Sequence, residues 1–254
     1  MQRIIKYPRT QHIKGSKLQD GDYDLSQIPF SEIENKHIVI EEKVDGANVG
    51  ISFSSDGGLL LQSRGHFLVG GYKERHYDLL KIFASENYQQ LYSVLGDKYI
   101  MYGEWLYAKH KIYYDALPSY FLEFDVYDKE KGVFLDTTSR RELLKDLPIH
   151  SVPVLASGKF NSMQEVLSYL TNSKYKTENC EQNLLQTIND LNLDREECLS
   201  ETDVSPLMEG LYIKVEENGI VTNRMKYVRY SFTQPNSVTT SKWLTKPIIP
   251  NKLL

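Results

Sequence analysis

The chain has 254 residues, 41% hydrophobic and 25% charged, which is the balance of a soluble globular protein and not of a disordered one. Its formal net charge of −4 argues against a protein that coats nucleic acid by bulk charge, although it leaves room for a local basic groove. No apolar run approaches the roughly 20 residues that span a bilayer, and Met1 to Thr10 carries no secretory signal. Cys180 and Cys198 are too few for a disulfide framework. We therefore expect a cytoplasmic protein with free thiols and no membrane partner.

Charged side chains are segregated along the chain. Basic residues gather in the N-terminal segment and again near residue 226, whereas acidic residues gather between Glu178 and Asp203. The basic residues are Arg3, Lys6, Arg9, Lys14, Lys17, Arg224, Lys226 and Arg229. Such a distribution either creates a positive face on an acidic protein or is ordinary solvated surface charge, and both interpretations stay open.

Short strands are predicted over most of the first half of the chain. Residues 37–44, 47–53 and 59–63 are rich in β-formers and are separated by turn residues, which predicts two or three adjacent antiparallel strands. Residues 77–95 carry leucine and phenylalanine at helical spacing. Two aromatic-rich strands then follow, and their predicted ranges are 98–107 and 120–127.

The pattern changes after residue 137. Short helices are predicted at 139–147, 162–170 and 181–191, and strands return at 210–215 and 220–228, joined by an Asn218-Gly219 hairpin turn. We expect residues 160–203 to form a largely helical insertion. Because no βαβ unit repeats, the sequence predicts an α+β fold in which antiparallel β-sheets are flanked by helices, within a single domain over residues 1–254.

Lys43 is the first candidate for chemistry. It lies in Glu41-Glu42-Lys43-Val44-Asp45-Gly46-Ala47-Asn48, at the end of a predicted strand, where a following turn glycine would present its amine at the rim of a sheet. Lys-x-Asp-Gly alone arises by chance in roughly one chain in twenty of this size. On that segment alone, a surface lysine beside a turn is the simpler interpretation.

Further segments in a fixed order change this interpretation. They are Tyr102-Gly103-Glu104-Trp105, Phe121-Leu122-Glu123-Phe124-Asp125, Glu209-Gly210-Leu211-Tyr212-Ile213-Lys214 and Arg224-Met225-Lys226. Together with the lysine segment, the set resembles the covalent nucleotidyltransferase superfamily, which comprises polynucleotide ligases and mRNA capping enzymes. In those families a Lys-x-Asp-Gly nucleophile motif precedes a carboxylate motif, an aromatic motif, a Glu-Gly-x-x-x-Lys motif and a basic motif. The resemblance extends from Glu41 to Lys226.

Within the superfamily, the sequence is most similar to ATP-dependent RNA ligases of the phage nick-sealing type and their bacterial relatives. The similarity rests on Asn48 after the nucleophile motif, on the segments Gly-Glu-Trp-Leu-Tyr-Ala-Lys and Tyr-Phe-Leu-Glu-Phe-Asp-Val-Tyr-Asp, and on the opening Lys6-Tyr7-Pro8-Arg9-Thr10 to His12-Ile13-Lys14-Gly15-Ser16. One departure is that the basic motif is Arg224-Met225-Lys226, where many ligases have Lys-x-Lys. Guanidinium and ammonium groups differ in geometry, so the phosphate contacts stay open.

The resemblance implies a three-step ligation of RNA. Lys43 would attack the α-phosphorus of ATP to give a lysyl adenylate and pyrophosphate, AMP would pass to a 5′-phosphate end, and a 3′-hydroxyl would displace it. The lysine must attack as a neutral amine, and deprotonating a free lysine at pH 7.4 costs about 4 kcal/mol. Nearby cations such as Lys214 and Lys226 would lower that cost.

The resemblance also implies roles for basic side chains. Lys214 and Lys226 would act with Lys43 in catalysis by contacting the α-phosphate and the departing pyrophosphate. Arg224 would pair with phosphate or with a neighbouring carboxylate. Arg64 would hold a ribose or the end-group phosphate, and an exposed arginine at a strand end is its alternative interpretation.

Carboxylates are expected to bind the metal ion and the nucleoside. Glu209 would bind Mg²⁺ or Mn²⁺, and Glu104 would bind the same ion or a ribose hydroxyl. Glu42 would lie beside the adenine, while Asp45 and Asn48 would shape the pocket around Lys43. Asn48 is alternatively a local hydrogen bonder of a turn.

An aromatic side chain is expected to stack on the adenine. Phe124 is the first candidate and Phe121 the second. Strand alternation places the two on opposite faces, so at most one of them would reach the base. A core aromatic is the alternative for each.

Three classes of function stay open. The first is an ATP-dependent RNA ligase for nicked or broken RNA, with a role in RNA repair; the second is a DNA ligase or a GTP-using capping nucleotidyltransferase; the third is a non-catalytic nucleotide- or RNA-binding module. About 28 residues follow Lys226, so we expect no C-terminal OB domain. Sealing would then be weak, would need an accessory protein or end-healing enzyme, or would use the N-terminal basic segment and residues 160–203 as RNA contacts.

Overall fold

The computed structural model describes residues 3–18, 22, 25–232 and 246–254. Within them one sheet contains the strands β1 (Gln11–His12), β2 (Ile38–Lys43), β3 (Ala47–Phe53), β4 (Leu59–Ser63), β5 (Tyr99–Trp105), β6 (Phe121–Asp128), β7 (Val133–Leu135), β8 (His150–Ser151), β9 (Val154–Gly158), β10 (Gly210–Glu217) and β11 (Ile220–Val228). The helices are η1 (Phe30–Glu32), η2 (Tyr72–Tyr77), α1 (Asp78–Glu86), α2 (Tyr88–Leu95), α3 (Thr137–Leu144), α4 (Met163–Leu167), α5 (Cys180–Asp190) and α6 (Arg195–Ser200). This arrangement confirms the antiparallel α+β fold predicted from the sequence.

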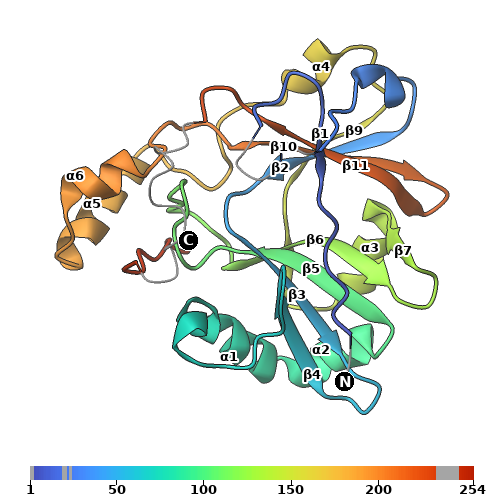
Figure 1. Ribbon diagram of the computed structural model, residues 1–254, viewed down its shortest axis with the longest axis horizontal. Helices are drawn as coiled ribbons and strands as arrows, with labels where there is room; N and C mark the ends of the chain where they lie inside the picture. Colours follow the sequence, from blue (N-terminus) through green and yellow to red (C-terminus); the bar gives the residue numbers. More distant parts are fainter. Residues whose placement is uncertain (1–2, 19–21, 23–24, 233–245) are drawn as a thin grey trace.

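The sheet consists of two halves joined by a short strand. Its order is β4-β3-β5-β6-β7-β11-β10-β2-β9, with β1 parallel to β11 and β8 parallel to β6. The linking strand β7 pairs through Val133 and Phe134 with β6, and through Phe134 and Leu135 with β11. We call β4-β3-β5-β6 the lower half-sheet and β11-β10-β2-β9 the upper half-sheet, after their places in Figure 1. The chain passes from the upper to the lower half between β2 and β3.

The upper half-sheet has one apolar and one charged face, because side chains alternate along its strands. Ile40, Ile213 and Met225 from three neighbouring strands share the apolar face and form a buried core. Residues one position away, such as Glu41 and Lys214, therefore point to the opposite face, toward the lower half-sheet. This second face carries charged side chains, among them Glu41 and Lys214.

The lower half-sheet is covered by α1 and α2. Ile51 and Phe53 of β3 pack with Leu80 and Leu91 of these helices in a second buried core. The sequence predicted one helix over 77–95, but two helices form, with a break at Asn87. The Asn87 side-chain amide donates to the Phe83 carbonyl at 2.8 Å, a local bond that competes with the helix.

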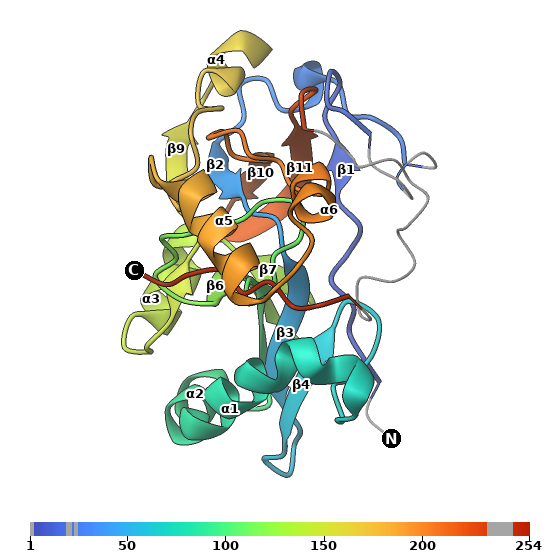
Figure 2. The same cartoon turned by 90° about the vertical axis from the view of Figure 1, so that its left-hand side faces the viewer.

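Residues 160–203 contribute helices to two separate places. Met163 and Val166 of α4 pack on the core of the upper half-sheet, whereas Leu184 of α5 packs with Tyr113 and Ile249 in a different cluster. Figures 1 and 2 show α5 and α6 projecting on one side of the molecule, away from α4. That this stretch is an insertion into a single domain stays a prediction.

The N-terminal segment runs along both half-sheets before it reaches β1 (Figure 2). The strands and the Asn218-Gly219 turn predicted from the sequence are present, with ends shifted by one or two residues. No helix within the described ranges is long and apolar enough to cross a bilayer.

Candidate active site

Lys43 is the last residue of β2, at the point where the chain leaves the upper half-sheet. Its backbone is in register with Gly210 of β10, so the preceding residue Glu209 lies beside it. The Lys43 Nζ donates to Glu209 Oε2 at 2.6 Å. The Lys43 side chain is 20% exposed and the Glu209 side chain 1%, so the amine sits at the border between a buried carboxylate and open space.

The turn after Lys43 is fixed by close backbone contacts. A Cβ on Gly46 would lie 2.6 Å from the Trp105 carbonyl oxygen, so only glycine fits there. The Gly46 N–H donates to Glu104 Oε1 at 3.1 Å. The Asp45 carboxylate accepts from the backbone N–H groups of Lys111 and Ile112 at 2.7 and 2.9 Å. These bonds tie Asp45 to the backbone of residues 111 and 112, and its role in shaping the pocket around Lys43 stays a prediction.

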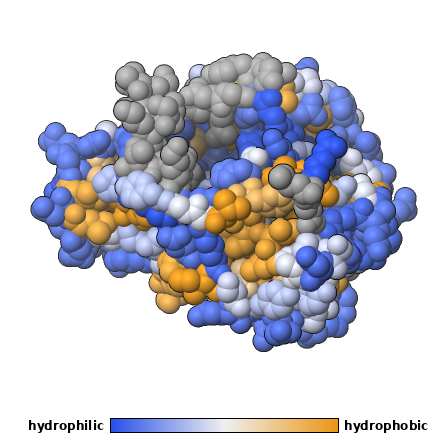
Figure 3. All heavy atoms as spheres, turned by 60° about the horizontal axis from the view of Figure 1, so that its bottom comes forward, coloured by the Kyte–Doolittle hydropathy of each residue, from blue (hydrophilic) through white to orange (hydrophobic). Residues whose placement is uncertain are grey.

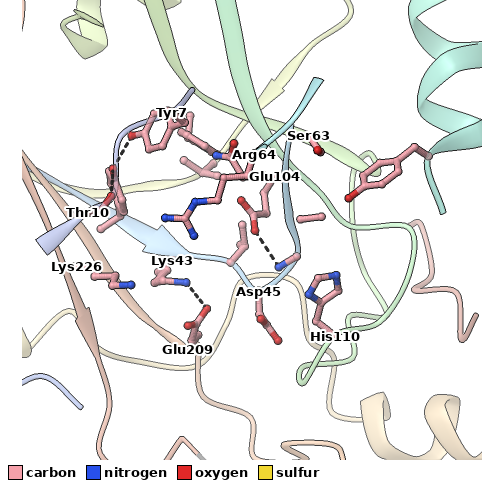
Figure 4. Close-up of a pocket in the computed structure, with 18 of the residues that line it drawn as sticks. Tyr7, Thr10, Lys43, Asp45, Ser63, Arg64, Glu104, His110, Glu209 and Lys226 are labelled. Carbon is pink, nitrogen blue, oxygen red and sulfur yellow. Dashed lines mark hydrogen bonds and ion pairs between the residues drawn. The ribbon is translucent and has the colours of Figure 1, made fainter. Parts of the chain in front are cut away.

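A cavity of about 1000 Å³ opens between the half-sheets in front of Lys43. Eight of the predicted nucleotide-site residues line it: Glu42, Lys43, Asn48, Arg64, Glu104, Phe124, Glu209 and Lys226. Figure 4 shows the Lys43 and Lys226 amines and the Arg64 guanidinium facing one space, with the Glu104 and Glu209 carboxylates on its other sides. Its size suits a nucleotide-sized ligand, and its floor combines apolar and charged groups.

Lys214 and Arg224 do not line this cavity. Lys214 is fully buried, and its Nζ lies 2.9 Å from Glu41 Oε2 and 3.0 Å from Asp125 Oδ1. Arg224 lies with its guanidinium carbon 3.8 Å from the centre of the Phe134 ring. Lys214 shares the face of Glu41, but neither it nor Arg224 reaches the cavity. This arrangement does not support the predicted direct phosphate contacts, and it supports the predicted pairing of Arg224 with a carboxylate, since its Nε is 3.9 Å from Asp125.

The two predicted aromatic candidates lie on opposite faces, as expected. Phe121 belongs to the core of the lower half-sheet, 1% exposed. Phe124 faces the cavity and packs edge-on against Tyr7 at 5.2 Å. Of the two, only Phe124 is placed to meet a base, and its stacking role stays a prediction.

The Glu42 carboxylate is turned away from Lys43. Ser173 Oγ donates to it at 2.5 Å and the Lys174 N–H at 3.1 Å, and burial raises its pKa. Glu41, two residues before Lys43 and on the same face, is the glutamate that connects to the charged interior. Glu42 was predicted to lie beside the adenine through its backbone as much as its side chain; it lines the cavity, and that role stays a prediction.

The electrostatics of the site favour a protonated Lys43 in this arrangement. Burial lowers the pKa of Lys43, but Glu209, Glu104 and Asp45 offset burial and raise the pKa above its usual value. Burial raises the pKa of Glu104 to about 8, against the attraction of Lys43. Burial and the neighbouring Lys43 lower the pKa of Lys226. Carboxylates therefore dominate the immediate surroundings of the nucleophile.

The N-terminal segment supplies site residues that the sequence analysis did not assign. Tyr7 and Thr10 line the cavity, and the Tyr7 hydroxyl donates to Asp125 Oδ2 at 2.5 Å. Asp22 forms an ion pair with Lys226. The Lys6-Tyr7-Pro8-Arg9-Thr10 opening was noticed as part of the resemblance, but nothing in its pattern indicated a contact with the cavity.

A metal ion fits this site only together with other oxygen donors. Among the described residues no group of three or more histidine, cysteine, aspartate or glutamate side chains is arranged to hold an ion. The cavity offers the carboxylates of Glu104 and Glu209. Mg²⁺ in phosphate sites commonly takes one or two carboxylates, with phosphate oxygens and waters completing the shell. The donor set therefore fits an ion that arrives with a nucleotide.

Comparisons with known proteins identify a family and a fold. A family model described as RNA ligase matches residues 36–228, well over half of the chain. The structure of the Naegleria gruberi RNA ligase, as a glutamate-to-alanine mutant with ATP and Mn, is similar with a TM-score of 0.53 and 16% identity over 90% of this chain. The structure of a second mutant of that ligase, with AMP and Mn, is similar with a TM-score of 0.52 and 16% identity over 89% of this chain. This chain spans 57% and 56% of those two chains, and the likeness concerns the fold. The comparison with curated proteins found no match.

Proposed function

Because this chain belongs to the RNA ligase family, we propose that it is an ATP-dependent enzyme that joins RNA ends through a covalent adenylate on Lys43. The Lys43–Glu209 pair at the mouth of the cavity carries the proposal. It places a primary amine, held by one buried carboxylate, in front of a nucleotide-sized space that is also faced by Arg64 and Lys226. The ATP and AMP in the Naegleria gruberi structures support the choice of nucleotide.

In the first step the Lys43 nitrogen attacks the α-phosphorus of ATP. A P–N bond forms, the bond from the α-phosphorus to the bridging oxygen breaks, and pyrophosphate leaves. Glu209 holds Lys43 as an ammonium in the resting arrangement. When Glu209 turns to another partner, burial and the repulsion between Lys43 and Lys226 lower the Lys43 pKa, and its proton passes to solvent.

Positive side chains neutralise the phosphates during this transfer. Lys226 and Arg64 face the Lys43 nitrogen from two sides of the cavity, where they would hold phosphate oxygens in line for attack. Glu209 and Glu104 would hold Mg²⁺ or Mn²⁺, which supplies further positive charge to the phosphate oxygens when bound. Lys214 would act indirectly, because its ion pairs hold the carboxylates of Glu41 and Asp125 in place.

The remaining steps transfer AMP and join the ends. An oxygen of the RNA 5′-phosphate attacks the α-phosphorus, the P–N bond breaks, and the Lys43 amine is regenerated. The 3′-hydroxyl oxygen of the second end then attacks the 5′-phosphorus, AMP leaves, and the hydroxyl proton passes to solvent. An accessory or end-healing protein would be needed where the ends lack these groups.

The first test is covalent labelling of Lys43. Incubation with α-labelled ATP and Mg²⁺ or Mn²⁺ should place the label on the protein in a form stable to base and released by acid, as expected of a P–N bond. Lys43→Ala should abolish labelling. Lys36→Ala, a change at an exposed lysine just before β2, should label like the wild type. Equal labelling of Lys43→Ala and wild type would exclude this mechanism.

The second test separates the alternative functions. Wild-type protein carrying the label is offered nicked RNA, nicked DNA and single strands with 5′-phosphate and 3′-hydroxyl ends, and GTP is compared with ATP in the labelling step. Sealing of RNA with ATP supports the proposal. Preferential labelling by GTP, or sealing of all-DNA nicks alone, supports a capping enzyme or a DNA ligase, and nucleotide binding without a covalent product supports a binding module.

A further inference from the structure

The rim of the cavity carries an exposed aromatic ring. Tyr72 lines the cavity and is 71% exposed, and Val69 on the same loop is 89% exposed. Figure 3 shows apolar side chains gathered on the face that it turns forward, and Ile82 of α1 is also exposed. Large apolar side chains next to a functional cavity commonly mark a binding surface.

The loop that presents Tyr72 is firmly built. The Glu74 carboxylate, 7% exposed, accepts from the Val69 and Gly70 N–H groups at 3.2 and 2.6 Å and pairs with Lys81 at 3.0 Å. Gly70 and Gly71 adopt φ values of 109° and 108°, which other residues rarely adopt. Nothing lies within 4 Å of a Cβ built at either glycine. The two glycines are therefore needed for their backbone conformation, which turns Tyr72 outward, and not for lack of space.

Arg75 holds the Tyr72 ring in place. Its guanidinium carbon lies 4.9 Å from the ring centre, and its Nη1 donates to the Tyr72 hydroxyl at 2.8 Å. Its Nη2 donates to the Lys246 carbonyl at 2.6 Å, which anchors the guanidinium to the C-terminal part of the chain. An aromatic side chain that is fixed and still largely exposed loses little entropy when a flat ligand stacks on it.

The same wall of the cavity carries groups that suit a nucleic-acid end. Arg64 and His66 follow β4 and line the cavity beside the Tyr72 loop. The His66 ring is oriented by Ser63, with 2.9 Å between Ser63 Oγ and His66 Nδ1. A guanidinium for phosphate next to an aromatic ring for a base is the combination with which proteins bind single strands.

We propose that Tyr72 is a stacking platform for the RNA nucleobase next to the ligation junction, with Arg64 meeting the phosphate of that end. This inference rests on the proposed function and identifies where that function takes its RNA. The RNA base is favoured over the adenine of ATP because the cavity has a separate apolar lining for adenine. That lining is formed by Phe124 with Val44 and Val152, which belong to a different cluster.

The test uses nicked RNA with 2-aminopurine, a fluorescent base quenched by stacking, at the junction. Binding to adenylated wild-type protein should quench the fluorescence. Tyr72→Leu should lose most of the quenching and raise the KM for RNA about tenfold, as expected for one base–aromatic stack. Tyr72→Phe keeps the ring and should retain the quenching. Tyr230→Leu is the matched control, because Tyr230 is 83% exposed and does not line the cavity.

The outcomes separate this inference from the proposed function. If the wild type forms no covalent adenylate, the proposed function is wrong, and the role of Tyr72 as an RNA stacking platform is wrong with it. If the wild type is adenylated and Tyr72→Leu quenches and seals like Tyr230→Leu, the platform is wrong and the function stands. If Tyr72→Leu raises the KM for ATP in the labelling reaction more than the KM for RNA, the ring stacks on adenine and the proposed RNA site is overturned.

Discussion

Carboxylates outweigh cations around Lys43: of the two lysines expected nearby, Lys226 faces the same cavity and Lys214 does not. Glu209, Glu104 and Asp45 raise its pKa against the effect of burial, and Lys214 is engaged elsewhere. In this arrangement the Lys43 amine is therefore held in its protonated form. Under the proposed mechanism, its activation requires a ligand that draws the carboxylates away.

Glu104 gives a prediction for the pH dependence of stability. Its pKa is about 8 in the folded protein, above the usual value of 4.5, chiefly because of burial. The folded protein then binds more protons than the unfolded one between these pH values, so Glu104 makes the free energy of unfolding fall as pH rises from about 4.5 to 8. Glu104→Gln should leave stability almost unchanged below about pH 4 and raise it by about 2 kcal/mol near pH 8, after allowance for partial exposure.

Urea unfolding at a series of pH values measures this effect. Glu86→Gln, at an exposed position of α1, is the control and should follow the wild type at every pH. A constant difference between Glu104→Gln and wild type from pH 5 to 8 would contradict the raised pKa of Glu104.

The N-terminal segment is the element that completes the cavity, and it lies outside the residues matched by the family model. A chain of hydrogen bonds runs through it. The Val228 N–H donates to Ser16 Oγ at 2.9 Å, Ser16 Oγ lies 2.6 Å from His12 Nδ1, and His12 Nε2 lies 3.1 Å from Asp22 Oδ2. Burial lowers the pKa of His12, so its neutral ring accepts from Ser16 and donates to Asp22.

The last residue of this series of hydrogen bonds, Asp22, also forms an ion pair with Lys226. We therefore predict that Asp22 positions Lys226. Asp22→Asn should keep the fold but leave Lys226 without its counter-charge, lowering the rate of Lys43 labelling about tenfold and raising the KM for ATP. Asp22→Glu should restore part of the rate. Asp146→Asn, at an exposed position after α3, is the control, and single-turnover labelling is the measurement. Labelling at the wild-type rate in Asp22→Asn would show that the pair only fastens the N-terminal segment.

The strands were predictable from the sequence, because alternation is a local property. Lys43, Glu104, Glu209 and Lys226 were located by the ordered motifs of the family resemblance, and all four line the cavity. Whether a side chain on a given face of a strand reaches the cavity or is buried against other side chains was not predictable. Lys214 shares the face of Lys43, but its partners Asp125 and Glu41 come from strands far away in sequence. Likewise, nothing in residues 3–18 indicates that they lie against β11.

Residues from both half-sheets meet in one buried network of charges. Its members are Glu41, Glu123, Asp125, Arg140, Lys214 and Arg224, three acidic and three basic residues. Arg140 of α3 is fully buried, contacts both oxygens of Glu123 at 2.9 and 3.0 Å and pairs with Glu41. Glu123 belongs to the lower half-sheet and Glu41 to the upper, so Arg140 connects the halves behind the cavity.

Removing Arg140 should therefore destabilise the whole molecule. Arg140→Met fills a similar volume but leaves Glu41 and Glu123 buried with less counter-charge, and the free energy of unfolding should fall by about 3–5 kcal/mol. Arg141→Met, the exposed neighbour on α3, should change it by less than about 0.5 kcal/mol. Urea or thermal unfolding measures both variants. A loss below about 1 kcal/mol in Arg140→Met would mean that the network is not a source of stability.

Strand β7 within the sheet and the buried Arg140 behind the cavity both join the half-sheets. Lys226 is carried by the upper half-sheet, whereas Arg64 and Tyr72 follow strands of the lower one. Lys43 lies where the chain crosses between them, at the end of β2. The lining of the cavity therefore comes from both half-sheets, and its shape depends on the junction that holds them together.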